Sequence, residues 1–188
     1  MTSPPLRWLL VTFTAALVSV PAAAAKTPSP KTLYSALLTT TIPDSALPSG
    51  FTGAKTSYAQ PSKTSVKYGA VGEVTVSVDG LDPNDAIAFT VFPDSSSALA
   101  DLHHGIPSTE KQPGPVHGFS ASVLLAYSVK GKNILGHEVT DGVSDAAAAV
   151  GNVLVQGVTT SADSTESGNV PAAISLLRAA VKYEQSLA

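Results

Sequence analysis

The alternation of apolar and polar positions predicts paired β-strands in the middle of the chain. Two runs, VGEVTVSVDG at residues 71–80 and AIAFTVFP at residues 86–93, place an apolar residue at every second position. This period of two is typical of a strand with one buried face. The buried-face positions are Val74, Val76 and Val78 in the first run and Ile87, Phe89 and Val91 in the second. The turn-forming segment LDPND separates the runs, so we expect an antiparallel pair.

A second pair of strands is predicted nearer the C-terminus. The run FSASVLLAYSV, residues 119–129, alternates strongly, and one face carries Val123, Leu125, Tyr127 and Val129. The segment KGKN, residues 130–133, can then turn the chain back. A weaker strand is expected in ILGHEVTDGV, residues 134–143.

The stretch AAAAVGNVLVQGVTT, residues 146–160, supports two structures. Its alanines favour a helix, but Gly151 and Asn152 at its centre are poor helix formers that tolerate positive φ angles. We therefore favour a hairpin of residues 146–150 and 153–159 around a Gly-Asn turn over a helix that ends at Gly151. The apolar part, residues 146–155, is too short to cross a bilayer.

Helical spacing appears in three other places. Residues 33–42 place Leu33, Ala36, Leu37 and Thr40 on one side, and Pro43 stops this helix. A short helix is expected in SSSALADLHH, residues 95–104, capped by Asp94 or Ser95 and ended by Gly105 in a left-handed conformation. The last helix follows Asn169 and Pro171, with Ile174, Leu177 and Val181 facing the core.

These elements predict an α+β fold with one antiparallel sheet of about five or six strands and packed helices, including a C-terminal helix. The segment at residues 43–63 is rich in proline and is expected to be irregular, with Leu47 and Phe51 as its core anchors. Residues 105–118 are expected to form a loop.

The first 25 residues have the three parts of a secretory signal peptide. Arg7 precedes an apolar run from Trp8 to Val20, and small residues follow up to Ala25, where we expect cleavage. An uncleaved membrane anchor is the alternative, which the short apolar run and Pro21 disfavour. The sequence thus predicts a signal peptide at 1–25, a flexible leader at 26–30 and one α+β domain at 31–188. The predicted location is secreted, extracellular or cell-wall associated.

Composition excludes several classes of function. The chain carries 11 basic and 14 acidic residues, and its net charge of −3 becomes more negative if Arg7 leaves with the signal peptide. A mildly acidic chain without a basic cluster argues against nucleic acid and anionic membrane surfaces as partners. With no cysteine there can be no disulfide, thiolate metal ligand, thiol nucleophile or lipid-modified amino-terminal cysteine. We expect no membrane span after signal cleavage.

Several motifs together resemble those of small exported actinobacterial proteins. They are SGFTGAK, YGAVGEVTVSV, AIAFTVFPDSSSALADL, DGVSDAAAAVGNVLVQGVTT and AAISLLRAAVKY, spread over most of residues 31–185. In their order, these elements are also similar to the extracellular sensor domains of mycobacterial membrane kinases and to related cell-envelope lipoproteins. The resemblance implies sensing or binding in the cell envelope. This chain departs from those sensor domains in having neither cysteines nor a kinase part.

Catalytic and metal-binding patterns are weak. The histidines at 103, 104, 117 and 137 could supply nitrogen ligands to zinc, but adjacent histidines on a helix point about 100° apart. Histidines at a helix end more commonly interact with its last carbonyls. No G-x-S-x-G motif is present, and Ser120 with His117 or Asp141 with His137 are neighbours in sequence only. A carboxylate pair for glycoside cleavage could be drawn from residues 73, 79, 82 and 85, but the acidic residues of DGLDPND serve a turn without catalysis. No catalytic residue, metal or cofactor is predicted.

A ligand site is predicted on whichever face of the sheet the helices leave open. Phe92, Leu124 and Tyr127 would line an apolar cleft beside the loop at residues 105–118. Alternatively, these residues pack beneath the amino-terminal helix. The resulting hypothesis is an exported non-enzymatic protein that binds a small apolar ligand or a cell-envelope component. A secreted hydrolase without a recognisable motif is the alternative, and a structural protein with a fully covered sheet and no sizeable cavity is the third candidate.

Overall fold

The computed structural model describes most of the chain after residue 27. The described ranges are 28–80, 84–105, 115–132, 138–161 and 169–187. The predicted signal peptide and residues 26 and 27 of the predicted leader therefore lie outside the described residues. No helix within these ranges is long and apolar enough to span a membrane.

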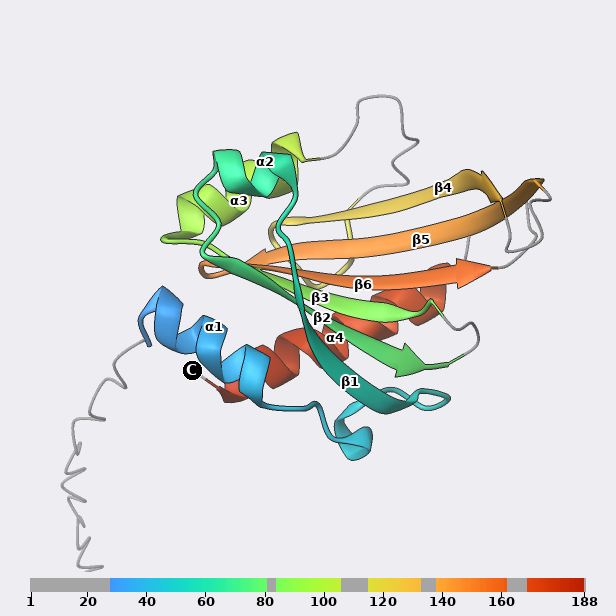
Figure 1. Cartoon of the computed structure of the whole chain (residues 1–188), viewed down its shortest axis with the longest axis horizontal. Helices are drawn as coiled ribbons and strands as arrows, with labels where there is room; N and C mark the ends of the chain where they lie inside the picture. The colour runs from blue at the N-terminus through green and yellow to red at the C-terminus, as the bar shows by residue number, and fades with distance from the viewer. Residues whose placement is uncertain (1–27, 81–83, 106–114, 133–137, 162–168, 188) are drawn as a thin grey trace, which may run out of the picture.

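Six antiparallel strands form one open sheet in the order β1-β2-β3-β6-β5-β4 (Figure 1). The strands are β1 (Thr52–Ala59), β2 (Gly72–Asp79), β3 (Ala86–Val91), β4 (Ser122–Lys132), β5 (Glu138–Val150) and β6 (Val153–Ser161). The helices are α1 (Pro30–Thr39), α2 (Lys63–Lys67), α3 (Ser95–His104) and α4 (Val170–Ser186), with a short 3-10 turn η1 at Asp44–Ala46. The predicted α+β fold with its C-terminal helix is confirmed.

The helices divide between the two faces of the sheet. Helices α1 and α4 lie on one face, and α2 and α3 lie on the other (Figure 1). The main core fills the first layer, because one set of alternating apolar side chains on the strands points towards α1 and α4. Its fully buried members include Val74, Val76, Ile87, Phe89, Val155 and Leu177.

The C-terminal helix α4 begins and packs as its sequence predicts. The side chain of Asn169 accepts a hydrogen bond from the Ala172 amide at 3.1 Å, which satisfies one of the free donors of the first turn. Leu177 and Val181 are buried against the sheet. Arg178 is exposed. This amphipathic pattern fixes which side of the helix faces β5 and β6.

The ambiguous stretch at residues 146–160 is a hairpin, so the predicted β5–β6 turn is confirmed. Gly151 adopts a φ of 55°, a conformation that glycine reaches without strain. Asn152 then secures the turn to the end of β3. Its side-chain amide donates to the Phe92 carbonyl at 2.8 Å, and its own carbonyl accepts from the Phe92 amide at 2.8 Å.

Three local predictions are wrong. The segment predicted to be irregular contains η1 and β1, and α2 begins at its last residue, although Leu47 and Phe51 are buried as expected. Strand β1 lies at the sheet edge and is largely exposed, so its sequence lacks a strong apolar alternation. Strand β4 continues through the predicted KGKN turn as far as Lys132. Gly105 ends α3 with a right-handed φ of −72°.

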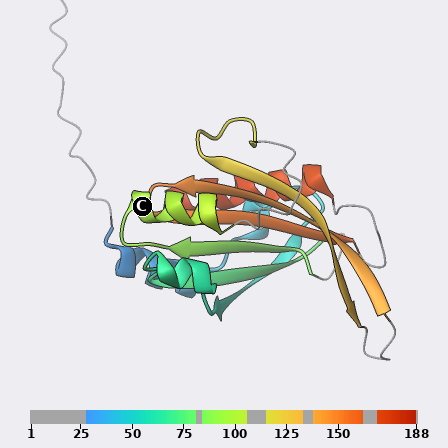
Figure 2. The ribbon, with the colours of Figure 1, turned by 90° about the horizontal axis from the view of Figure 1, so that it is seen from above.

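The α2–α3 layer covers only part of its face of the sheet. A small apolar cluster of Phe92, Ala98, Leu102, Ala147 and Leu154 joins α3 to the sheet near the β5–β6 turn. Strands β4 and β5 run on well beyond these helices, and no described helix covers their far part on this side (Figures 1 and 2). Beyond α2 and α3, this face of the sheet is not covered by any described helix.

Candidate functional site: an acidic cavity beside α3

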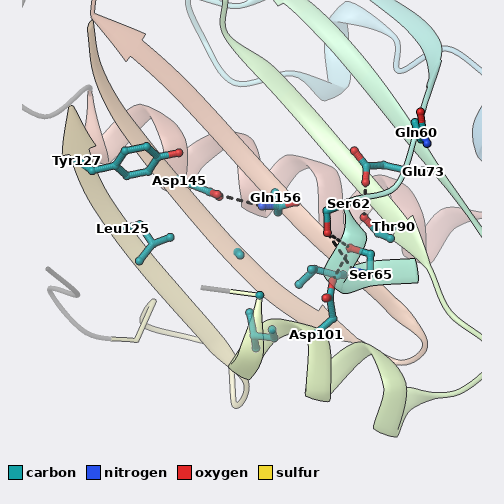
Figure 3. A pocket seen from close by; sticks show the side chains of 14 residues that line it. Gln60, Ser62, Ser65, Glu73, Thr90, Asp101, Leu125, Tyr127, Asp145 and Gln156 are labelled. Carbon is teal, nitrogen blue, oxygen red and sulfur yellow. Dashed lines mark hydrogen bonds between the residues drawn. The ribbon is translucent and has the colours of Figure 1, made fainter. Parts of the chain in front are cut away.

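A cavity of about 410 Å³ lies where α2 and α3 meet the uncovered part of the sheet (Figure 3). Its size falls within the range of small-molecule sites in proteins. Its polar lining comes from strands, at Glu73, Thr90, Tyr127, Asp145 and Gln156, and from the α2–α3 side, at Gln60, Ser62, Ser65 and Asp101. Leu102, Leu125, Ala147 and Leu154 supply its apolar lining.

Sheet register brings the strand residues of the cavity together. Glu73 on β2 is opposite Thr90 on β3, and the Thr90 hydroxyl donates to Glu73 Oε2 at 3.3 Å. Asp145 on β5 is the cross-strand neighbour of Leu125 on β4. The amide of Gln156 on β6 donates to Asp145 Oδ2 at 3.0 Å. Each of these side chains points away from the α1–α4 core because its neighbours along the strand point into that core.

Helices α2 and α3 place Asp101 at the other side of the cavity. The Ser65 hydroxyl on α2 donates to Asp101 Oδ2 at 2.9 Å. Ser65 is itself held by Ser62, whose hydroxyl caps α2 and lies 2.8 Å from the Ser65 hydroxyl. The rings of Tyr68 and His104 stack at 6.0 Å and add a second link between the two helices. These contacts fix the position of the Asp101 carboxyl group.

Asp101 is an unusual residue for a buried position. Only 3% of its surface is exposed, and its Oδ1 atom accepts no hydrogen bond from any residue that the structure describes. Burial raises the pKa of Asp101 above its ordinary value, while the hydrogen bond from Ser65 opposes that rise. A buried carboxylate oxygen without a donor is costly, so this group is poised to accept a hydrogen bond from a ligand.

Gly105 keeps space open next to Asp101. A Cβ atom at residue 105 would lie 2.7 Å from the Asp101 carbonyl oxygen and 3.5 Å from Asp101 Oδ1. Gly105 was predicted to be needed for a left-handed conformation. It is needed instead because a side chain at residue 105 would collide with the last turn of α3. Gly105 also belongs to the cavity lining, so a larger residue there would disturb both the helix end and the carboxyl group.

The electrostatic character of the cavity is acidic. Burial raises the pKa of Glu73, the charge of Asp101 raises it further, and the hydrogen bond from Thr90 lowers it. Asp145 is a third carboxyl group in the lining, and it is also largely buried. No lysine, arginine or histidine belongs to the part of the lining that the structure describes. The described lining therefore gathers three carboxyl groups and no basic side chain.

The three residues predicted to line a cleft do not share one surface. Tyr127 lines the cavity. Phe92 is completely buried in the small cluster beneath α3. Leu124 points to the opposite face and packs in the main core, because neighbouring residues of a strand alternate between faces. The structure therefore does not bring Phe92, Leu124 and Tyr127 together in one cleft. Of the three, Tyr127 lines the cavity on the incompletely covered face of the sheet.

Sequence reasoning missed the acidic residues of the cavity. Glu73 was weighed with Asp79, Asp82 and Asp85 as a source of paired carboxylates and was set aside. Asp85 is buried near the β2–β3 turn, where its carboxylate accepts a hydrogen bond from the Thr160 amide. Asp101 stands between Ala98 and Leu102 on the buried side of α3, and Asp145 shares one side of β5 with Ala147. An acidic residue at an otherwise apolar position was the signal that could have revealed them.

Of the histidines and serines considered for catalysis, those that the structure describes do not line the cavity. His103, His104 and His117 are exposed, and His137 lies outside the described residues, as does any pairing of it with Asp141. Ser120 is also exposed and does not line the cavity. Within the described ranges, no group of three or more histidine and acidic side chains could hold a metal ion.

Comparison with known proteins finds no matching family model, no matching curated protein and no matching solved structure. The function must therefore be argued from the cavity itself. The three carboxyl groups of Glu73, Asp101 and Asp145 can accept hydrogen bonds and attract positive charge. Thr90 orients Glu73, and Gln156 orients Asp145.

Proposed function

We propose that this chain is an exported, non-enzymatic protein of the cell envelope or its surroundings that binds a small polar molecule. The observation that carries the proposal is the cavity of about 410 Å³, in which buried and half-buried polar side chains from β2, β3, β5, β6 and α3 converge. Convergent polar groups on a rigid sheet are typical of a binding site, because the strands hold them in place before the ligand arrives.

Export is supported by the sequence alone. The charged, apolar and small-residue parts of residues 1–25 fit a signal peptide, and a chain without cysteine tolerates an oxidising compartment without forming unwanted disulfides. The resemblance of its motifs to small exported actinobacterial proteins agrees with a place in the cell envelope. Binding is the activity that this resemblance and the cavity have in common.

The lining favours a polar ligand over the apolar ligand expected from the sequence. Leu102, Leu125, Ala147 and Leu154 can contact aliphatic parts of a ligand. A wholly apolar molecule would bury the carboxyl groups further without giving them hydrogen bonds, which costs free energy. The existence of a cavity on a partly uncovered face also argues against a purely structural protein, which would need a fully covered sheet.

Native mass spectrometry of the full-length gene product, recovered from the medium of a bacterial host, tests this proposal. We expect a bound mass that disappears on denaturation. Replacing Tyr127, which lines the cavity, with alanine should reduce the affinity for this ligand about fivefold or more, which corresponds to about 1 kcal/mol of lost contacts.

Tyr58→Ala is the matched control. Tyr58 is 63% exposed and is paired with Val74, so it lies on the α1 side of the sheet, away from the cavity. This variant should keep the bound mass. The proposal fails if the wild-type protein stays bare even after incubation with small molecules extracted from the medium, or if both tyrosine variants behave alike.

A secreted hydrolase is the second candidate, and one observation favours it. Glu73 and Asp101 are two carboxyl groups in one cavity, and glycoside cleavage uses such a pair, one of them with a raised pKa. It ranks second because burial raises the pKa of both groups, whereas that mechanism needs one of them to stay readily ionised. Turnover of glycosides that Glu73→Gln abolishes would reverse this ranking.

A further inference from the structure

We propose that the ligand of this cavity carries a protonated amine, and that the amine sits between Asp101 and Glu73. This inference rests on the proposed binding function and names the chemical class of its ligand. The two carboxyl groups come from α3 and β2, and both line the cavity (Figure 3). One oxygen of each accepts a hydrogen bond from a hydroxyl group, Ser65 for Asp101 and Thr90 for Glu73.

Asp101 supplies the most specific evidence for a hydrogen-bond donor in the ligand. Its Oδ2 atom is satisfied by Ser65, but its Oδ1 atom has no partner among the described residues although the side chain is 97% buried, being 3% exposed. Buried polar atoms in folded proteins nearly always have a partner. An ammonium group is a pure donor with three N–H bonds, so it can satisfy this oxygen and still reach a neighbouring carboxylate.

Charge selects a cation over a neutral donor. Glu73, Asp101 and Asp145 all line the cavity, and no basic side chain belongs to its described lining. Gly105, at the carboxyl end of α3, also lines the cavity, and the carboxyl end of a helix carries partial negative charge. A positively charged group relieves the repulsion among these carboxylates and forms charge-assisted hydrogen bonds, which are stronger than neutral ones.

The remainder of the lining suits an aliphatic amine. Leu102, Leu125, Ala147 and Leu154 provide apolar contacts for a short methylene chain, and Gln156 with Asp145 forms a second polar end. A metal ion is a poorer fit, because the described residues do not arrange three or more metal-binding side chains around a common point. The site thus combines an ammonium-binding end with an apolar path beside it.

Isothermal titration of the full-length secreted protein with three molecules of similar length tests the inference. Putrescine carries two ammonium groups, 1,4-butanediol is neutral and succinate is anionic. We expect putrescine to bind at least about tenfold more tightly than either of the others. Asp101→Asn, which keeps the shape and the hydrogen bond from Ser65 but removes the charge, should weaken putrescine binding about tenfold or more. Glu73→Gln should weaken it in the same direction.

Glu138→Gln is the control for non-specific attraction to an acidic protein. Glu138 is exposed at the start of β5, and its loss changes the net charge by the same amount as Asp101→Asn. It should leave putrescine binding unchanged. Thermal unfolding of each variant shows whether it is folded, and the Glu73→Gln result stands if Asp101→Asn unfolds.

The outcomes separate this inference from the proposed binding function. Selective putrescine binding that Asp101→Asn weakens and Glu138→Gln preserves supports the amine. Equal binding of all three molecules, no binding of putrescine, or equal effects of all three charge variants overturns it. A bound mass in the native spectrum that contains no amine would overturn the amine while leaving the binding function intact, and a bare mass would count against the binding function itself.

Discussion

Phe89→Ala is expected to lower the free energy of unfolding by about 3–5 kcal/mol. Phe89 lies in the central strand β3, is completely buried, and its ring is tilted at 51° against Tyr183 of α4 with the centroids 6.4 Å apart. Truncation would remove most of the side chain and leave a cavity between the sheet and the helix, which the surrounding strands could fill only in part. Urea unfolding followed by circular dichroism measures the loss.

An aromatic residue at the sheet edge gives the comparison for Phe89. Tyr58→Ala also removes a large ring, but from a 63% exposed position on β1. Its cost should stay within about 1 kcal/mol, the span of strand propensities. Similar losses for the two variants would mean that the α1–α4 layer does not form the main core.

Gly157→Ala is expected to cost about 3 kcal/mol, an unusually large effect for adding one methyl group. Gly157 lies on β6 where α4 crosses the sheet. A Cβ atom at this position would lie 2.5 Å from the Leu177 amide nitrogen and even closer to the Ala173 carbonyl oxygen. Both obstacles are helix backbone, so α4 would have to move away from the sheet and lose packing along its length.

Gly131→Ala is the matched control for Gly157. Gly131 is also a strand glycine, on β4, and a Cβ atom there would meet no atom within 4 Å. The substitution should change the free energy of unfolding by less than about 1 kcal/mol, with no loss of native packing. If Gly157→Ala proved equally mild in urea unfolding, α4 would not approach β6 as closely as the structure indicates.

The elements that could be predicted from the sequence are those whose pattern matches their burial. Strands β2 and β3 alternate cleanly because one side faces the main core and the other does not. Helix α4 has both a capping residue and a regular apolar face, so its start and orientation follow from local physics. The β5–β6 hairpin was recognisable because Gly151 and Asn152 favour a turn where the alanines would otherwise continue a helix.

The elements that could not be predicted depend on distant parts of the chain. Strand β1 is defined by its pairing with β2, and its exposed side chains give it no apolar period. The end of α3 was expected to need a left-handed glycine, whereas Gly105 is required by the nearby Asp101 carbonyl oxygen. Such close approaches follow from tertiary packing, which a local pattern does not reveal.

The chemistry of the cavity could not be predicted from the sequence. The expected cleft depended on one face of the sheet staying open, and Tyr127 is the one of its three residues that lines the cavity. Phe92 was assigned to the cleft, although it directly follows β3 and is buried in the small apolar cluster beneath α3. The carboxyl groups come from three elements that are far apart in the sequence, and only the register of the sheet and the packing of α3 bring them together.

Two-dimensional ¹H–¹⁵N NMR of the full-length protein, titrated with putrescine, tests the central claim most directly, because it locates binding residue by residue. We predict saturable shifts in the side-chain amide of Gln156 and in the backbone amides of Ser65, Glu73 and Asp101, with little change along α1 and α4. Saturable shifts confined to α1, α4 or the exposed acidic surface, or no saturable shifts at all, would contradict the assignment of this cavity as the binding site.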